Sequence, residues 1–215
     1  GMPASMERNT GTNSASTTIS FGGPIDRVSA VNRALMVPGV SQAEGWISSA
    51  GTVVRDGAIE GSTLQLFGGS ATSPFVNPPM TTGRWLAPYS AETRNEIVVS
   101  RNLPDSEPNL GIGSVVTLKR GNTEHAFTIV GMFSAGPGGI LAYGQYETIG
   151  RFAGQQEMAT SVRVRTAGED ALSVRTITNQ LRDLFEARGV QVVNAQSRIE
   201  LINQVVTAFD TIITL

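Results

Sequence analysis

The sequence carries one β-α-β pattern twice, within residues 17–67 and again within residues 161–193, and a long segment of different character separates the two copies. A single copy leaves one face of its strands uncovered, whereas two copies can share a sheet and a core. They can share a sheet only if the intervening segment leaves and returns at one place. The pattern therefore constrains the chain to a discontinuous domain with an insertion.

The first copy begins with a predicted strand at Thr17–Phe21, where strand-forming residues dominate. Gly22-Gly23-Pro24 is expected to open a helix, because proline is favoured in a first helical turn and Asp26 suits the positive end of the helix dipole. Extended residues 40–54 and a strand at Thr63–Phe67 complete this copy. The predicted buried face of the helix consists of Ile25, Val28, Val31, Ala34 and Leu35.

The second copy begins at Ser161–Arg165, where alternating valines predict a half-buried strand with Arg163 and Arg165 on its solvated face. The spacing of Thr166 and Glu169 predicts a capping box for the next helix. A return strand is predicted at 190–193. The helix is expected to bury Leu172, Ile177, Leu181, Leu184 and Phe185.

Between the copies, turns and short strands replace helical patterns. The clearest predicted strands are Glu96–Ser100, Ser114–Lys119 and Ala126–Met132. Arg120-Gly121-Asn122 predicts a tight hairpin turn between the last two of them. Because short strands joined by turns are typical of antiparallel sheets, this segment is predicted to be an antiparallel β module.

Together these patterns predict an α+β fold in which two βαβ halves form a ferredoxin-like α/β sandwich with an inserted β-rich subdomain. The sandwich is expected to comprise residues 17–73 and 157–198, and the insertion residues 74–156. Residues 1–16 are expected to be a flexible lead-in.

The last segment, 199–215, becomes increasingly apolar and stops without a terminating Gly, Pro or charged turn. Ser197 and Glu200 are spaced as a capping box that opens this last helix. We expect more apolar residues to follow, and Gly1 before Met2 indicates a cleaved tag. The chain is thus expected to be a fragment of a longer protein.

Composition argues against several classes of function. The chain has no cysteine, which excludes disulfides, thiolate catalysis and nearly all structural zinc sites. Its single histidine, His125, excludes multi-histidine metal sites. The net charge is −2 and no basic stripe is present, which argues against nucleic acid as a partner. We therefore expect no catalytic residues, no bound metal and no cofactor.

Several polar groups have a functional and a structural interpretation. His125 with Glu124 could form a catalytic or pH-sensing pair, but its place after a hairpin turn favours a solvated strand start. Asp105 and Glu107 are expected to form a solvated turn, because a calcium loop needs more oxygen ligands. The two tryptophans, at 46 and 85, are expected in the core.

The segment Gly136-Pro137-Gly138-Gly139 lacks the Lys-Ser/Thr of a phosphate-binding loop and is expected to connect two strands flexibly. If this loop lies at the distal tip, Phe133, Ile140 and Tyr143 would form a partner-contact patch.

Five short motifs occur in an order that resembles the MacB-like periplasmic core domain of FtsX-like family ABC transporter permeases. The family pattern has a "PGV" after the first helix, a "GR" with an aromatic residue, a "VVV" strand, a "GxxI" strand entry and a "ftVvGv" strand. The matching residues are Leu35–Val40, Thr82–Leu86, Asn95–Leu103, Leu110–Leu118 and Phe127–Phe133. The resemblance spans Ile19 to Ile213, and the Pro-rich 103–110 departs from it where relatives often carry a short helix.

The resemblance implies an extracytoplasmic domain between two transmembrane helices of a permease in the cell membrane, with 199–215 as a stalk helix leading toward the second of them. A separate cytoplasmic subunit or domain would hydrolyse ATP, and this domain would relay conformational change between the membrane helices and an external substrate or partner, such as an adaptor or lipoprotein. A free-standing extracytoplasmic ligand-binding module would instead need a deep apolar pocket with converging polar groups. A hydrolase would need a cleft with strongly perturbed titratable groups.

Overall fold

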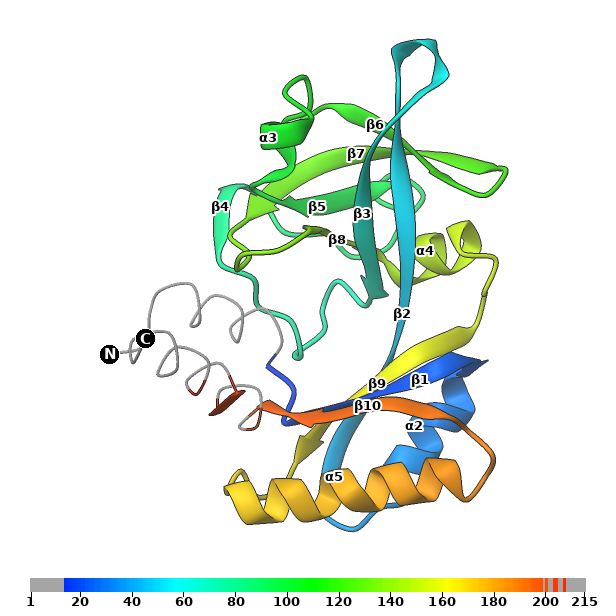
Figure 1. Ribbon diagram of the computed structural model, residues 1–215, viewed down its shortest axis with the longest axis vertical. Helices are drawn as coiled ribbons and strands as arrows, with labels where there is room; N and C mark the ends of the chain where they lie inside the picture. The colour runs from blue at the N-terminus through cyan, green and yellow to red at the C-terminus, as the bar shows by residue number, and fades with distance from the viewer. Residues whose placement is uncertain (1–13, 199, 201–202, 205–206, 208–215) are drawn as a thin grey trace. The chain divides into compact units, whose positions relative to one another are not determined.

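The computed structural model describes residues 14–198, 200, 203, 204 and 207 (Figure 1). These residues divide into two compact units. Unit 1 holds the described residues up to Gly45, those of Phe75–Asn77 and those from Ala159 onward, and unit 2 holds Trp46–Pro74 and Pro78–Met158. The predicted stalk helix and positions 1–13 of the predicted lead-in lie almost wholly outside the described residues. No helix among the described residues is both long and apolar enough to span a bilayer.

Unit 1 is a sheet with two helices on one face, and its strands follow the order β10-β1-β9-β2. Figure 1 shows α2 and α5 lying together against this sheet. The elements are β1 (Thr17–Asp26), α2 (Arg27–Leu35), the first part of β2 (Val40–Arg55), β9 (Met158–Thr166), α5 (Ala171–Glu186) and β10 (Val192–Ser197).

Helix α2 begins later than the sequence indicated. Strand β1 continues through Pro24 to Asp26, so the expected helix start at Gly22-Gly23-Pro24 is wrong. Asp26 is the N-cap, and its carboxylate accepts a hydrogen bond from the Ser29 amide at 2.8 Å. The buried face of α2 also differs from the prediction. Ala30 and Ala34 are buried, whereas Val28 and Leu35, predicted to be inside, are exposed.

Helix α5 begins later than its predicted capping box implied and has a different cap. Asp170 accepts from the Ser173 amide at 3.0 Å. The predicted capping box is wrong because Thr166 Oγ1 donates to the Gly168 carbonyl and Glu169 accepts from the Ser16 hydroxyl. The buried face is Ile177, Leu181 and Phe185 as predicted, with Leu184 partly buried, but Leu172 is exposed.

Burial in unit 1 differs from the prediction at two polar residues, Arg163 and Ser16. Arg163 is 5% exposed and therefore does not lie on a solvated face of β9. Ser16, which the sequence placed at the end of the lead-in, is buried as well. The other predicted capping box, that of Ser197 and Glu200, is present. The Glu200 amide donates to Ser197 Oγ, and the Ser197 amide donates to the Glu200 carboxylate.

Unit 2 is a ring of strands closed on itself. The strands pair in the order β2-β3-β8-β5-β7-β6, and β6 pairs again with β2. Its elements are the second part of β2, β3 (Ile59–Gly69), β4 (Met80–Gly83), β5 (Glu96–Ser100), α3 (Leu103–Ser106), β6 (Val115–Arg120), β7 (Thr123–Phe133), β8 (Ile140–Gln145) and α4 (Tyr146–Phe152). The short helix α3 occupies the place where the sequence was expected to depart from the family.

The predicted hairpin of β6 and β7 is confirmed, with Gly121 at positive φ in its turn. The predicted all-antiparallel module is wrong, because β3 pairs with β8, and β5 with β7, in parallel. These pairs join strands far apart in the sequence, so local turn signals could not reveal them. The resulting sheet is mixed.

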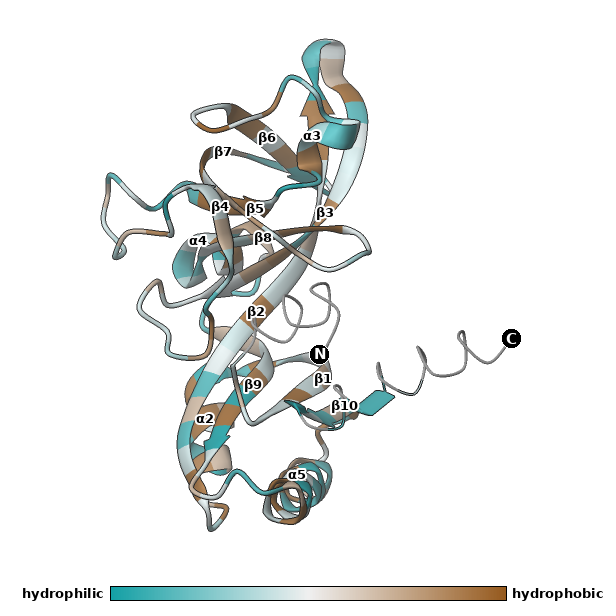
Figure 2. Ribbon diagram, turned by 90° about the vertical axis from the view of Figure 1, so that its left-hand side faces the viewer, coloured by the Kyte–Doolittle hydropathy of each residue, from teal (hydrophilic) through white to brown (hydrophobic). Residues whose placement is uncertain are grey.

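Strand β2 contributes to both units, since the boundary between Gly45 and Trp46 falls within it. Figure 2 shows brown hydrophobic bands interrupting its paler length. Within unit 2 its buried residues join one apolar core inside the ring. This core includes Ile47, Val53, Leu64, Leu66, Ile97, Leu118, Phe127, Ile129 and Ile149.

Candidate functional site

The predicted partner-contact patch is not a surface in this structure. Phe133 is fully buried and Tyr143 is 3% exposed, while Ile140 is half-buried. The Tyr143 ring lies 5.4 Å from that of Phe133, centroid to centroid. It also contacts the rings of Trp46, Phe67 and Trp85. Phe133 and Tyr143, which were expected to meet a partner, therefore belong to an aromatic cluster of unit 2 instead.

His125 is half-buried instead of solvated. Its Nε2 lies 2.8 Å from the Asn95 side-chain oxygen, and its ring centroid lies 4.6 Å from that of Phe127, with the two rings tilted. Burial, followed by the nearby Arg151 and Arg94 charges, lowers the pKa of His125. Burial and the two arginine charges each disfavour a positive charge on the imidazole, so its neutral form is favoured.

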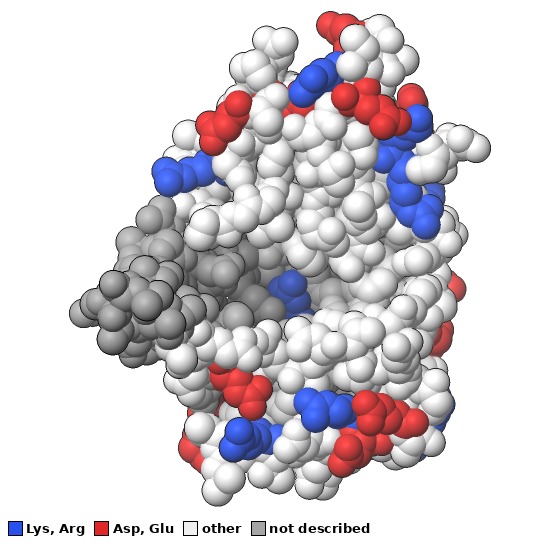
Figure 3. Space-filling model, in the orientation of Figure 1, with Lys and Arg blue, Asp and Glu red and all other residues white. Residues whose placement is uncertain are grey.

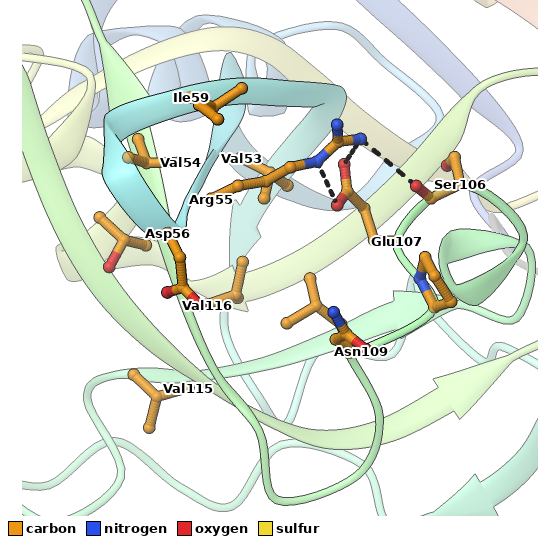
Figure 4. Close-up of a pocket in the computed structure, with 13 residues that line it drawn as sticks. Val53, Val54, Arg55, Asp56, Ile59, Ser106, Glu107, Asn109, Val115 and Val116 are labelled. Carbon is orange, nitrogen blue, oxygen red and sulfur yellow. Dashed lines mark hydrogen bonds and ion pairs between the residues drawn. The ribbon is translucent and has the colours of Figure 1, made fainter.

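A pocket of about 570 Å³ opens in unit 2 beside the turn that joins β2 to β3. Three segments line it: the end of β2 with the start of β3, the loop after α3, and the start of β6 (Figure 4). They contribute residues 53–56 with Ile59, residues 106–110, and residues 115–117. The volume falls within the range of about 300–1,000 Å³ that is typical of ligand-binding pockets.

The pocket combines a buried apolar floor with apolar side chains at its mouth. Val53 and Val116 are each 2% exposed. In contrast, Ile59 is 60% and Val115 63% exposed, and both line the pocket. Isolated exposed aliphatic residues are common, so these two add apolar surface to the pocket without forming one patch.

An ion pair forms one wall. Arg55 Nε and Nη2 each donate to the Glu107 carboxylate at 2.9 Å, and the Ser62 amide donates to the same carboxylate at 2.7 Å. The Arg55 bonds, with the Ser62 amide adding to them, lower the pKa of Glu107 to about 2. Glu107 is 5% exposed, so the expected solvated turn is wrong at this residue. The pair neutralises two of the three charged side chains that line the pocket.

The third charged residue, Asp56, is exposed and forms no ion pair with any described residue. It begins the turn between β2 and β3. Figure 3 shows side chains of both charges gathered over this turn and α3. Within the described chain, no group of three or more acidic or histidine side chains is placed to hold a metal ion. The pocket thus keeps one uncompensated negative charge.

The pairing between β2 and β6, which closes the ring, ends beside this pocket. β2 pairs with β6 only at Thr52–Val54, opposite Thr117–Lys119, whereas β6 pairs with β7 from Val115 onward. Beyond the last of these pairs, only Val115 directs its backbone N–H and C=O toward β2, because Ser114 and Val116 bond toward β7.

Sequence reasoning missed this site. Its lining comes from three segments that were interpreted separately as a strand end, a turn and a strand entry. The one available signal was that Ile59 and Val115 stand in polar, turn-rich surroundings, where aliphatic residues are less expected.

No protein-family model and no curated protein matches the chain. Among solved structures, it is similar to the periplasmic region of MacB from Actinobacillus actinomycetemcomitans, with a TM-score of 0.60 and 15% identity over 92% of this chain and 94% of that one. It is also similar to the extracellular domain of the noncanonic ABC-type transporter YknZ from Gram-positive bacteria, with a TM-score of 0.55 and 16% identity over 83% of this chain and 100% of that one.

At these identities the likeness is one of fold, and it extends over nearly the whole chain. The resemblance to the MacB-like periplasmic domain is confirmed at that level. So is the α+β class, with its mixed sheet and few helices.

Proposed function

We propose that the chain is the extracytoplasmic domain of an ABC transporter permease, and that it relays conformational change between membrane helices and an external partner or substrate. The observation that carries the proposal is the fold shared with the MacB periplasmic region over 92% of this chain. In this proposal the domain has no chemistry of its own, and ATP hydrolysis takes place on a cytoplasmic subunit or domain. The external partner is an adaptor or lipoprotein that meets unit 2.

The division into two units supports a relay. Each unit has its own buried core, and the boundary at Gly45 falls inside a continuous strand. Strand β2 lies next to β9 in the sheet of unit 1 and pairs with β3 in unit 2, so a displacement at one end of this strand can be passed to the other unit. We assign unit 1 to the membrane-proximal sandwich and unit 2 to the inserted subdomain. The strand order β10-β1-β9-β2 supports a ferredoxin-like arrangement for the former.

A free-standing ligand-binding module is less well supported. The pocket beside the β2–β3 turn has the volume for a small molecule. However, its best-placed polar groups, Arg55 and Glu107, already satisfy each other. Such a module would need polar groups that converge on an empty space.

The relay can be tested by distance measurements on the full permease with its ATPase, reconstituted in lipid. This chain has no cysteine, so spin labels can be placed at chosen sites. The double variant Glu186→Cys with Glu124→Cys places one label at an exposed position of each unit. We expect the distance between these labels to change between nucleotide-free and ATP-trapped states.

The matched control is Asp105→Cys with Glu124→Cys, since both positions are exposed within unit 2. Its distance should stay constant in the same states. An unchanged distance between the units in every nucleotide state would contradict the relay. Labelling of Asp105→Cys in intact cells by a membrane-impermeant maleimide tests the extracytoplasmic location separately.

A further inference from the structure

We propose that three exposed arginines of unit 2, Arg94, Arg120 and Arg151, form with His125 a binding site for a phosphate group carried by a small solute or a lipid headgroup. The site lies where the β6–β7 hairpin, the turn before β5 and helix α4 meet. Such a site goes beyond the relay proposed above and does not depend on it.

Two hydrogen bonds bring the turn, the hairpin and the helix together. His125 Nε2 lies 2.8 Å from the Asn95 side-chain oxygen, which joins β7 to the turn that carries Arg94. Thr148 Oγ1 donates to the Arg94 carbonyl at 2.5 Å, which joins the same turn to α4. Arg94, His125 and the last turn of α4 are therefore held at one place.

Arg120 reaches this place from the hairpin. Leu118 pairs with His125, and Arg120 is two residues beyond Leu118, so all three side chains lie on the same face of the hairpin. A Cβ atom on Gly154, just after α4, would lie 3.9 Å from Arg120 Nη1. Figure 3 shows blue Lys and Arg side chains together at the right, where Figure 1 places the β6–β7 hairpin and α4.

The positive charge of this cluster is not compensated. None of the three arginines forms an ion pair within the described part of the chain. After burial, the charges of Arg151 and Arg94 lower the pKa of His125, so both charges that act on the ring are positive. An anion bound here would be attracted by the arginines and would also favour the protonated imidazole.

Carboxylates on the same segments leave the arginines unpaired. Glu92 is bonded to its own amide and to Ser90, and these bonds lower its pKa. Glu124 directly precedes the histidine in β7, so its side chain points to the other face of the strand. Glu147, one turn before the arginine of α4, and Glu157, in the following loop, are exposed and form no ion pair with any described residue.

A phosphate group fits this cluster better than a carboxylate does. A guanidinium group binds either anion through paired N–H donors. A carboxylate has two oxygens in one plane, whereas a phosphate group has three strongly accepting oxygens that point in different directions. Three arginines that arrive from three segments can therefore contact one phosphate group together.

Inorganic phosphate is the first probe, added to the ¹⁵N-labelled 215-residue chain at pH 7.5 and compared with sodium chloride at equal ionic strength. We expect saturable NMR shift changes centred on the amides of Asn95, His125 and Arg151. Arg94→Gln and Arg151→Gln should each weaken binding at least about threefold, on the order of the effect of one exposed ion pair. The matched control is Arg101→Gln, an exposed arginine at the other end of β5, which should leave the affinity unchanged.

Sulfate is the second probe, because it keeps two negative charges over the whole titration of His125, whereas phosphate itself titrates near neutral pH. Sulfate should raise the midpoint of the His125 titration by at least about 0.3 above its value in chloride at equal ionic strength. By linkage, the protonated protein then binds sulfate about twofold more tightly than the neutral one. The double variant Arg94→Gln with Arg151→Gln should lose this rise.

Vesicles identify the source of the phosphate group. Cosedimentation with phosphatidylglycerol vesicles but not with phosphatidylcholine vesicles, lost in the double variant, would assign the site to a lipid headgroup. Binding of inorganic phosphate without binding of vesicles would assign it to a soluble ligand.

The proposal is overturned if phosphate and sulfate act no differently from chloride and the vesicles do not bind. It is also overturned if Arg101→Gln weakens binding as much as Arg94→Gln or Arg151→Gln does, because general attraction to a positive surface would then explain the result. The relay is measured as a distance in the full permease, so the two proposals can fail separately.

Discussion

The guanidinium of Arg55 and the carboxylate of Glu107 are joined by two hydrogen bonds of 2.9 Å, although the residues are 52 positions apart in the chain. The pair connects the end of β2 to the loop after α3 and so fixes two of the three segments that line the pocket. Glu107 also accepts from the Ser62 amide in β3. One buried carboxylate thus holds three parts of unit 2 together.

Glu107→Gln should lower the free energy of unfolding by about 1–2 kcal/mol, because the amide keeps the shape but loses the charge-assisted bonds. Urea unfolding measures the change. The matched control is Glu60→Gln, which removes the exposed pair with Lys119 at 3.1 Å and should cost less than about 0.5 kcal/mol. Equal losses for the two variants would show that burial of Glu107 contributes nothing.

The same carboxylate predicts a dependence of stability on acid pH. The pKa of Glu107 is lowered from 4.5 to about 2 in the folded protein. Between these values the unfolded chain binds more protons, so the free energy of unfolding falls as the pH falls. The stabilisation is complete above pH 4.5 and is lost as the pH approaches 2.

Urea titrations at pH values from 6 to 2.5 should show the gap between wild type and Glu107→Gln narrowing with acidity. Glu96 and Asp26 also have lowered pKa values, through Arg84 and Ser29 respectively, so the wild type alone cannot isolate Glu107. The difference between the two proteins can. A constant gap over this range would contradict the assignment.

His125 predicts a second, separate pH window. Burial and the charges of Arg151 and Arg94 lower its pKa below the usual 6.5. The unfolded state therefore takes up a proton first as the pH falls, and stability decreases through this window. Above pH 6.5 the contribution is fully retained.

Because His125 is the only histidine, an NMR titration of its ring follows one group without assignment. We expect a midpoint below 6.5. His125→Gln can keep a hydrogen bond to Asn95, and its free energy of unfolding should change less than that of wild type between pH 7.5 and 5.5. A midpoint at or above 6.5 would refute the effect of burial and of the two arginines.

Local patterns in the sequence predicted those features that depend on neighbours in the chain. The β6–β7 hairpin follows from its turn at Gly121, and the buried face of α5 from the spacing of Ile177, Leu181 and Phe185. Caps were harder to predict. Asp170 and Glu169 are both plausible acceptors near one helix start, and Ser16, far away in sequence, decides that Glu169 is engaged elsewhere.

The closed ring and the pocket could not be predicted in this way. Ring closure depends on the β2–β6 pairs and on the parallel β3–β8 and β5–β7 pairs, which have no local turn to signal them. Tyr143 was expected at the surface because it follows a glycine-rich loop. Its burial depends on Trp46, Phe67, Trp85 and Phe133, which come from four separate segments.

The close approach of β4 and β7 predicts a strong effect of one added methyl group. Gly83 and Gly131 are opposite each other in this pair, and the Arg84 amide donates to the Val130 carbonyl at 3.0 Å. A Cβ atom on Gly131 would overlap the Arg84 carbonyl oxygen, which belongs to the backbone and cannot rotate away. The "GR" and "VvG" motifs of the sequence therefore meet at one crossing that needs glycine.

Gly131→Ala should reduce the free energy of unfolding by about 1–3 kcal/mol, because β4 must move off β7 to admit the methyl group. Arg84 would be displaced with β4, so its bonds to the Glu96 carboxylate should weaken as well. Gly111→Ala is the matched control, since a Cβ there meets nothing within 4 Å and its φ is not positive. It should change stability by less than about 0.5 kcal/mol. Comparable stability of the two alanine variants in urea would show that β4 is not held against β7 as the structure has it.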